Sequence, residues 1–458
     1  MAMAPSSISL PLRFMVTGLA SLLIALVWLV IQPEILASYH YSPTTVAATH
    51  LLVLGWILTT VMGAMYQLVP IALETRLYSE RLARWQFLIH VIGFVGMVWM
   101  FRNWNLKLVG HYGSAMALGM GLFVYNLVRT LMRVKKWNTV AISIATALFW
   151  ILFTAIVGLS IAAGKCEYDS AARLPSTSMV GALVHFVQQI GLFMARFAPL
   201  GAMHAHAHLG VVGFFLALMI GISYKLIPMF TLSEIQNHRR AAWSIGLLNA
   251  GLAGAFLSIL LQNRWKLAFA AVLMAALLLY GLEMRAILRR RKRGPLDWGV
   301  RSFLTAMGLL GPISVVGLVL AWPSLPWSDF NGQLENLYGF LALIGVMTFG
   351  ILGMLHKIIP FLIWFGVYSR QVGRARVPAL SDMYSARLQA TGYWIFLAGL
   401  ALASGGILAR HELLARCGGF FLLASLGTTL VNLAFILSHA WRPKLLPLQT
   451  DITPAKKR

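Results

Sequence analysis

The residues of this chain best suited to chemistry are three histidines at two-residue spacing. His204, His206 and His208 open the stretch "MHAHAHLGVVGFFLALMIGISYKLIP" (residues 203–228) and directly precede a strongly apolar run. An imidazole is costly to bury in hydrocarbon unless a ligand or a partner uses it. Neutral imidazole binds heme iron, copper and zinc, so these are the chemistries to expect here.

The spacing predicts that one helix presents these imidazoles in two directions. At about 100° per residue, His204 lies about 40° from His208, so this pair shares a helix face. His206 lies about 160° away from His208 on the same helix. We therefore expect two separate pockets, one on each side of the helix.

The composition indicates an integral membrane protein. The chain has 458 residues, of which 59% are hydrophobic and 11% charged, with a mean hydropathy of +0.78. That is more apolar surface than a soluble core could hide. We predict an all-α membrane fold with twelve transmembrane helices, roughly at 10–36, 43–73, 84–101, 106–132, 139–163, 200–231, 241–262, 264–288, 298–322, 333–365, 388–408 and 416–440.

The basic residues indicate topology rather than nucleic-acid binding. The net charge is +24, and the Lys and Arg residues gather in the short loops after even-numbered spans. By the positive-inside rule, both termini are expected on the cytoplasmic side of the membrane. We expect a bacterial-type inner membrane, with membrane lipid as the surrounding partner and no nucleic acid as a partner. The entrance of the sixth span, with its histidines, then lies at the outer face. Cys166 and Cys417 form no Cys-x-x-Cys-His motif, so any heme is expected to be held non-covalently.

A repeat links the second, sixth and tenth spans. The second and sixth share His, Gly, Gly, Tyr and Pro at offsets 0, 5, 13, 16 and 20, and the tenth keeps both glycines and the proline. The aligned residues are His50, Gly55, Gly63, Tyr66 and Pro70; His208, Gly213, Gly221, Tyr224 and Pro228; and Phe340, Gly345, Gly353, His356 and Pro360. We expect a single domain, residues 1–458, of three four-helix arcs at about 10–132, 139–288 and 298–440, with a cytoplasmic tail at 441–458. The glycines form a stripe opposite the histidine, which lets a neighbouring helix approach closely.

These motifs resemble a known family. "HLLVLGWILTTVMGAMYQLVP" and "HAHLGVVGFFLALMIGISYKLIP" are similar to the His-x-x-x-x-Gly pattern of the heme-binding helices in heme-copper oxidase subunit I, especially C-type cytochrome oxidases and nitric oxide reductases. The resemblance implies twelve helices in three arcs with pseudo-threefold symmetry, and it implies that His50 ligates a low-spin heme. If the chain is catalytic, it implies an oxidoreductase of the cytochrome c oxidase or nitric oxide reductase type. A periplasmic cytochrome, a quinol or other oxidase subunits are the partners it implies.

The chain departs from the family pattern at the catalytic centre. The family carries a His-x-His on the tenth helix, where this chain has Tyr338 and Phe340. The seventh span lacks the adjacent histidine pair that completes the family's copper site, and His238 precedes that span. No acidic residue stands at mid-depth in a span. These departures disfavour a proton-pumping terminal oxidase.

Three functions remain open from the sequence. The leading hypothesis is a respiratory electron-transfer protein with a b-type heme near the outer face between the second and sixth helices, held by His50 and by His208, or by His206 if the sixth helix is rotated. The alternative is a copper- or zinc-binding membrane protein or oxidase assembly factor without heme, in which His204 and His208 bind the metal and Glu335 or His185 completes the site. Transport of a small solute is a third hypothesis. Copper is also a candidate second cofactor beside heme.

The outer connection at 164–199 is the longest non-spanning segment. Its part "MVGALVHFVQQIGLFMARF" predicts a helix, whose His185, Gln188, Gln189 and Arg196 argue against a membrane crossing. We expect this helix to lie over the histidine pockets at the outer interface.

Overall fold

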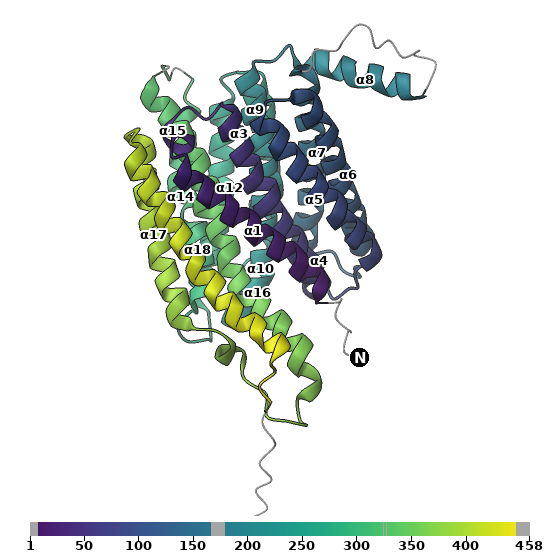
Figure 1. Cartoon of the computed structure of the whole chain (residues 1–458), viewed down its shortest axis with the longest axis vertical. Coiled ribbons are helices and arrows are strands. Elements are labelled where there is room, and N and C mark those ends of the chain that lie inside the picture. Colours follow the sequence, from purple (N-terminus) through teal and green to yellow (C-terminus); the bar gives the residue numbers. More distant parts are fainter. Residues whose placement is uncertain (1–7, 166–178, 324, 327, 446–458) are drawn as a thin grey trace, which may run out of the picture.

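Twelve long apolar helices form the fold (Figure 1). The computed structural model describes residues 8–165, 179–323, 325–326 and 328–445. Within those ranges, twelve helices are long and apolar enough to cross a membrane, which confirms the predicted number and the all-α class. They are α1 (Ser9–Ile31), Pro43–Ala72, α5 (Glu80–Arg102), α6 (Leu106–Leu131), α7 (Thr139–Lys165), Pro199–Thr231, α11 (His238–Leu260), α12 (Lys266–Arg289), Trp298–Leu320 (α13, Trp298–Gly308, and α14, Leu310–Leu320), Asp329–Gln371, α17 (Ala386–Leu408) and α18 (Glu412–Trp441). The shorter helices are α2 (Glu34–Ala37), α8 (Met179–Met194) and η5 (Leu380–Met383).

The second, sixth and tenth spans change from α- to π-helix at the same aligned position. Their segments are α3 (Pro43–His50), η1 (Leu51–Leu58) and α4 (Thr59–Ala72); α9 (Pro199–His208), η2 (Leu209–Leu216) and α10 (Ala217–Thr231); and α15 (Asp329–Phe340), η3 (Leu341–Thr348), α16 (Phe349–Tyr368) and η4 (Ser369–Gln371). Each π segment begins directly after the aligned residue His50, His208 or Phe340. Because π turns are rare and occur mostly at functional sites, their shared position supports the aligned register.

The glycine stripe packs each of these spans against the span before it. A Cβ atom on Gly55 or Gly63 would meet side chains of α1, and one on Gly213 or Gly221 would meet side chains of α7. In the tenth span, a Cβ on Gly353 would lie 2.6 Å from the carbonyl oxygen of Gly299 in α13. The glycines therefore bring the backbones of successive helices together in all three copies, as the stripe predicts.

These three spans also form the centre of the bundle. In their apolar windows 72%, 78% and 72% of the residues are buried, against 22–56% in the other nine spans. η3 contacts η1 and η2, and α4 contacts α10 and α16. A cavity of about 80 Å³ lies between them, lined mainly by aliphatic side chains such as Leu68, Leu226 and Ile358. Apolar cavities of this kind stay dry, so the centre of the bundle is a hydrophobic seam.

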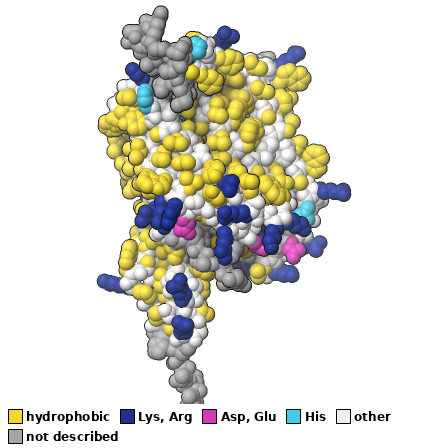
Figure 2. All heavy atoms as spheres, turned by 90° about the vertical axis from the view of Figure 1, so that its right-hand side faces the viewer, with side chains coloured by type: hydrophobic (Ala, Val, Ile, Leu, Met, Phe, Trp, Pro, Cys, Tyr) yellow, Lys and Arg dark blue, Asp and Glu magenta, His cyan; other side chains and the backbone are white. Residues whose placement is uncertain are grey.

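The histidine-bearing helix starts gather at one end of the bundle. α3, α9 and α15 lie at the top of Figure 1, whereas α1 begins and α18 ends at the bottom. Figure 2 shows a broad apolar band across one face, with most of the visible Lys and Arg side chains gathered below it, toward the end where α1 begins. This distribution suits a protein that crosses a membrane several times.

The predicted helix of the long connection is present as α8. In Figure 1 it lies at the upper right and extends away from the bundle, and its principal contact is with α7, where Gly164 and Gly191 approach closely. Phe186, Leu192 and Phe193 are 61%, 62% and 55% exposed, as on a helix that meets the membrane interface. Its position beside α7 differs from the expected position over the histidines.

The hairpin of α17 and α18 offers a test of this close packing. A Cβ on Gly418 would lie 2.6 Å from Cα of Ala403, whereas a Cβ on Gly427 of the same helix meets no atom within 4 Å. Both Gly→Ala changes gain the same helix propensity. We expect Gly418→Ala to destabilise the protein by about 1–3 kcal/mol and Gly427→Ala to be neutral or stabilising. Thermal unfolding in detergent measures the difference, and equal midpoints for the two variants would contradict it.

Candidate functional site

The three histidines of α9 lead to three different neighbours. Nε2 of His204 lies 3.1 Å from Nε2 of His40, and Nε2 of His208 lies 3.3 Å from the hydroxyl of Tyr338. His206 points the other way, toward α7, where a Cβ on Gly158 would lie 2.7 Å from its Cε1 atom. This arrangement confirms that one helix presents imidazoles in two directions.

His206, on the α7 side of α9, lies within electrostatic range of His50 at the end of α3. Nδ1 of His206 is buried without a hydrogen-bond partner. Nδ1 of His50 lies 2.7 Å from the carbonyl oxygen of Val46 one turn earlier, so Nδ1 carries the proton and Nε2 carries the lone pair.

The ring of His50 is held on its other side by an aromatic contact. Its centroid lies 4.4 Å from that of Phe101, near the end of α5, at an interplanar angle of 31°. The Val46 carbonyl fixes the tautomer of His50, and the Phe101 ring fixes the plane of its imidazole. Nε2 of His50 is therefore available as a ligand in one direction. This is the state in which a histidine binds a metal.

His208 is oriented in the same way but is already partnered. Its Nδ1 lies 2.7 Å from the carbonyl oxygen of His204, and its ring stacks on Tyr338 with centroids 5.8 Å apart. The Tyr338 hydroxyl donates to Nε2 of His208. Tyr338 is one of the two residues that replace the family's His-x-His, so the structure places a hydrogen bond where the resemblance implied an iron ligand.

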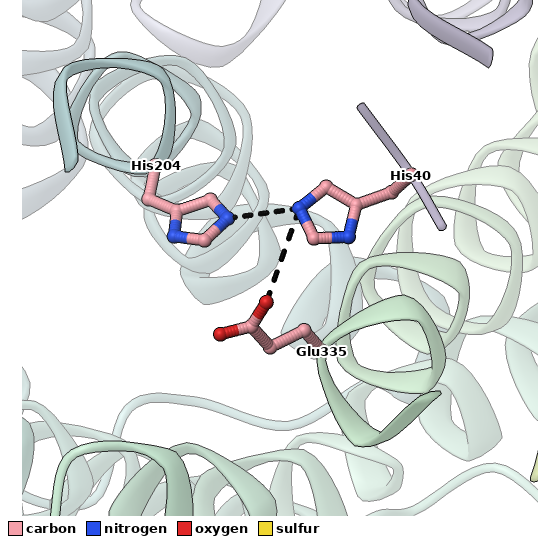
Figure 3. Close-up of side chains that lie close together, drawn as sticks. All are labelled: His40, His204 and Glu335. Carbon is pink, nitrogen blue, oxygen red and sulfur yellow. Dashed lines mark hydrogen bonds and ion pairs between the residues drawn. The ribbon is translucent and has the colours of Figure 1, made fainter. Parts of the chain in front are cut away.

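On the face of α9 opposite His206, His204 forms a cluster with a second imidazole and a carboxylate from other segments (Figure 3). Ligand atoms of His40, His204 and Glu335 all lie within 4.8 Å of one another. Oε2 of Glu335 is 3.9 Å from Nε2 of His40. His40 stands in the loop between α2 and α3, and Glu335 in α15. Burial lowers the pKa of His40, and its hydrogen bond to Asn336 opposes this, so His40 is neutral near pH 7.

The cluster includes two of the residues proposed as metal ligands and leaves out two others. His204 and Glu335 meet, as the metal hypothesis expects, but the third member is His40. His208 faces Tyr338 instead, and His185 is exposed on α8. His40 lies outside every predicted span, so helical spacing gave no reason to place it beside α9.

The sequence offers His208 or His206 as the second heme ligand beside His50; His208 is partnered by Tyr338, whereas Nδ1 of His206 has no partner. Two neutral imidazoles, from the second and sixth spans, have the ligand chemistry that heme iron needs, and Nδ1 of half-buried His206 has no hydrogen-bond partner. The family's copper site fits this chain less well. His238 stands at the start of α11, whereas α9 approaches the opposite end of α11, where Ile259 lies next to Gly201. His238 is therefore at the wrong end of α11 to join the histidines of α9.

The comparison with protein families supports the resemblance. The model of the family described as Cytochrome C and Quinol oxidase polypeptide I matches residues 2–103. A search of curated proteins finds no match. The matched stretch comprises α1, the second span and α5, and it holds His40 and His50. The resemblance to heme-copper oxidase subunit I is therefore confirmed for residues 2–103 of this multi-pass membrane protein.

Proposed function

We propose that this chain is a heme-binding membrane protein that transfers electrons, with a b-type heme held by His50 and His206 near the outer face. The observation that carries the proposal is that His206 lies within electrostatic range of His50, with Nδ1 of His206 buried and unpartnered. The oxidase-like match over residues 2–103 supports the same cofactor, since it includes His50.

The surrounding residues have defined roles in this proposal. The Val46 carbonyl keeps the His50 proton on Nδ1 and makes Nε2 the ligand atom. Gly158 gives the His206 ring room against α7, because any side chain there would collide with it. A bound heme supplies one-electron chemistry, and two imidazole ligands favour electron transfer over oxygen binding.

The position of the site bears on the electron donor. The positive-inside rule assigns the Arg-rich loops to the cytoplasmic side, which puts the starts of α3, α9 and α15 at the outer face, and we propose a bacterial-type inner membrane as the location. A heme there would exchange electrons with a periplasmic cytochrome, with quinol or with other oxidase subunits. The lack of a seventh-span histidine pair argues against oxygen or nitric oxide reduction by the family's copper-dependent route.

The test is heme content with and without His50. We expect the purified wild-type protein to give a reduced α band and a pyridine hemochrome of the b type, and His50→Ala to lose both. His111→Ala is the matched control, because His111 is an exposed histidine at the same end of the bundle whose Nδ1 bonds its own helix. His50→Met should keep heme with a raised midpoint potential, since methionine is also an axial ligand. Equal heme content in wild type and His50→Ala would overturn the proposal.

A further inference from the structure

We propose that His40, His204 and Glu335 bind a divalent transition-metal ion, Cu²⁺ or Zn²⁺, at the outer end of the bundle. This site is separate from the proposed heme, because it lies on the opposite face of α9 from His206. The three ligand atoms come from the loop before α3, from α9 and from α15 (Figure 3). The site does not depend on the heme proposal.

The protonation of His40 is already suited to a metal. The amide nitrogen of Asn336 donates to the carbonyl oxygen of Ser38 at 2.7 Å and to Oε1 of Gln333 at 3.1 Å. The amide oxygen of Asn336 is therefore turned toward Nδ1 of His40, 2.9 Å away, and accepts its proton. Nε2 of His40 is left with its lone pair directed at His204; Asn336 thus orients His40 as the hydrogen-bond partner of a metal-bound histidine does.

The contact between the two imidazoles is a hydrogen bond that a metal would replace. Because Nε2 of His40 carries a lone pair, the hydrogen bond at 3.1 Å requires that Nε2 of His204 carries the proton. Metal binding would move that proton to Nδ1 of His204, so both Nε2 atoms could bind one ion with no net change in charge on the rings. Tetrahedral zinc with bonds of about 2.0–2.1 Å separates its ligand atoms by about 3.4 Å. The separations of 3.1 Å between His40 and His204 and 3.9 Å between His40 and Glu335 lie on either side of this value, and the ligand atoms of His204 and Glu335 lie within 4.8 Å of each other.

The charges around the cluster tune the site. Glu335 is its only carboxylate ligand, and Lys266, at the start of α12, interacts electrostatically with both Glu335 and His204. Burial and the charge of Glu335 raise the pKa of nearby Tyr39, so its hydroxyl stays neutral. The ammonium of Lys266 opposes a bound cation, so Lys266→Gln should tighten metal binding.

The ligand set favours copper or zinc. Two imidazoles and one carboxylate are typical of sites that keep a coordination position open for water or another ligand. Among divalent first-row ions, Cu²⁺ binds such ligands most tightly, and imidazole is also a common ligand of Zn²⁺. The three ligands come from separate segments and leave one coordination position open. This indicates an exchangeable ion rather than a closed structural site.

The experiment measures metal binding directly, on full-length protein carrying an affinity tag without histidine. After chelator treatment, Cu²⁺ and Zn²⁺ are titrated separately against a competing chelator. Bound metal is counted by elemental analysis, and bound Cu²⁺ is examined by electron paramagnetic resonance for nitrogen couplings. The variants are His40→Ala, Glu335→Gln, Asn336→Ala and Lys266→Gln, with His111→Ala as the control histidine.

We expect each chain to retain one metal ion in the presence of the competing chelator. When that ion is Cu²⁺, its electron paramagnetic resonance spectrum should show couplings from two nitrogens. Loss of the residue that hydrogen-bonds a metal-binding histidine weakens metal binding by about 10–100-fold, which is the effect expected for Asn336→Ala. His40→Ala and Glu335→Gln should weaken it more, and His111→Ala should not change it. Absence of a bound ion in the wild type, or unchanged binding in either His40→Ala or Glu335→Gln, would overturn the site. Heme content is measured on the same samples and should be unchanged in His40→Ala and Glu335→Gln. This separates failure of the metal site from failure of the heme proposal.

Discussion

Replacing His206 with alanine is expected to remove almost all of the low-spin heme, whereas replacing His208 with alanine should leave most of it. The two imidazoles lie two residues apart on α9, and both precede η2. His206 lies within electrostatic range of His50 and has an unpartnered buried nitrogen, while Nε2 of His208 already accepts from Tyr338. The sequence alone left both residues as candidates for the second axial ligand.

Pyridine hemochrome quantitation and the low-spin iron resonance measure this difference. The two variants are each other's control, because they remove the same group from the same helix and differ only in the face from which it is removed. Retention of heme in His206→Ala together with loss in His208→Ala would show that the sixth helix holds iron through its other face. The hydrogen bond to Tyr338 would then have to break when heme binds.

The spans were predictable because each is a long apolar run, but their starts were less so. The spans expected to begin at residues 84 and 333 begin at Glu80 and Asp329. In both helices a serine side chain caps the first turn, Ser79 accepting from the amide of Leu82 and Ser328 accepting from that of Asn331. These first turns are polar, so they lie outside the apolar run, although capping makes them helical.

The repeat was also readable, but its local geometry was not. Aligned glycines predicted which residues face a neighbouring helix, and they pack against the preceding span in each copy. Nothing in the aligned residues distinguishes a π-helix from an α-helix. Because η1 has wider turns than an α-helix, the angle between His50 and the residues beyond it cannot be obtained from 100° per residue.

The cluster around His40 could not be assembled from the sequence. Helical spacing relates residues within one helix, whereas His40, His204 and Glu335 come from a loop and two spans far apart along the chain. His204 and Glu335 were paired because both are polar residues at the outer ends of spans. The third ligand depends on where the loop after α2 folds, and Asn336 determines this by bonding both the backbone of Ser38 and the ring of His40.

Replacing Glu283 with alanine is expected to lower the free energy of unfolding more than any other substitution proposed for this protein. The Glu283 side chain is fully buried near the end of α12, where Oε1 accepts from the backbone amides of Gln236 and Asn237 at 2.6 and 2.9 Å. Nε of Arg240 lies 3.5 Å from Oε2. The carboxylate therefore holds the loop after α10 and the start of α11 together.

Glu283→Ala leaves two amides and the guanidinium of Arg240 without their common partner, and removing one member of a buried ion pair costs about 3–5 kcal/mol. Glu283→Gln keeps an oxygen for the amides but loses the charge, so its cost should be smaller, at about 1.5–3 kcal/mol. Glu412→Ala, at an exposed glutamate in the first turn of α18, is the control and should change little. Thermal unfolding in detergent ranks the three variants, and hydrogen exchange at Gln236 and Asn237 locates the effect. Similar unfolding midpoints for Glu283→Ala and Glu412→Ala would mean that the loop is held by its apolar contacts and not by this carboxylate.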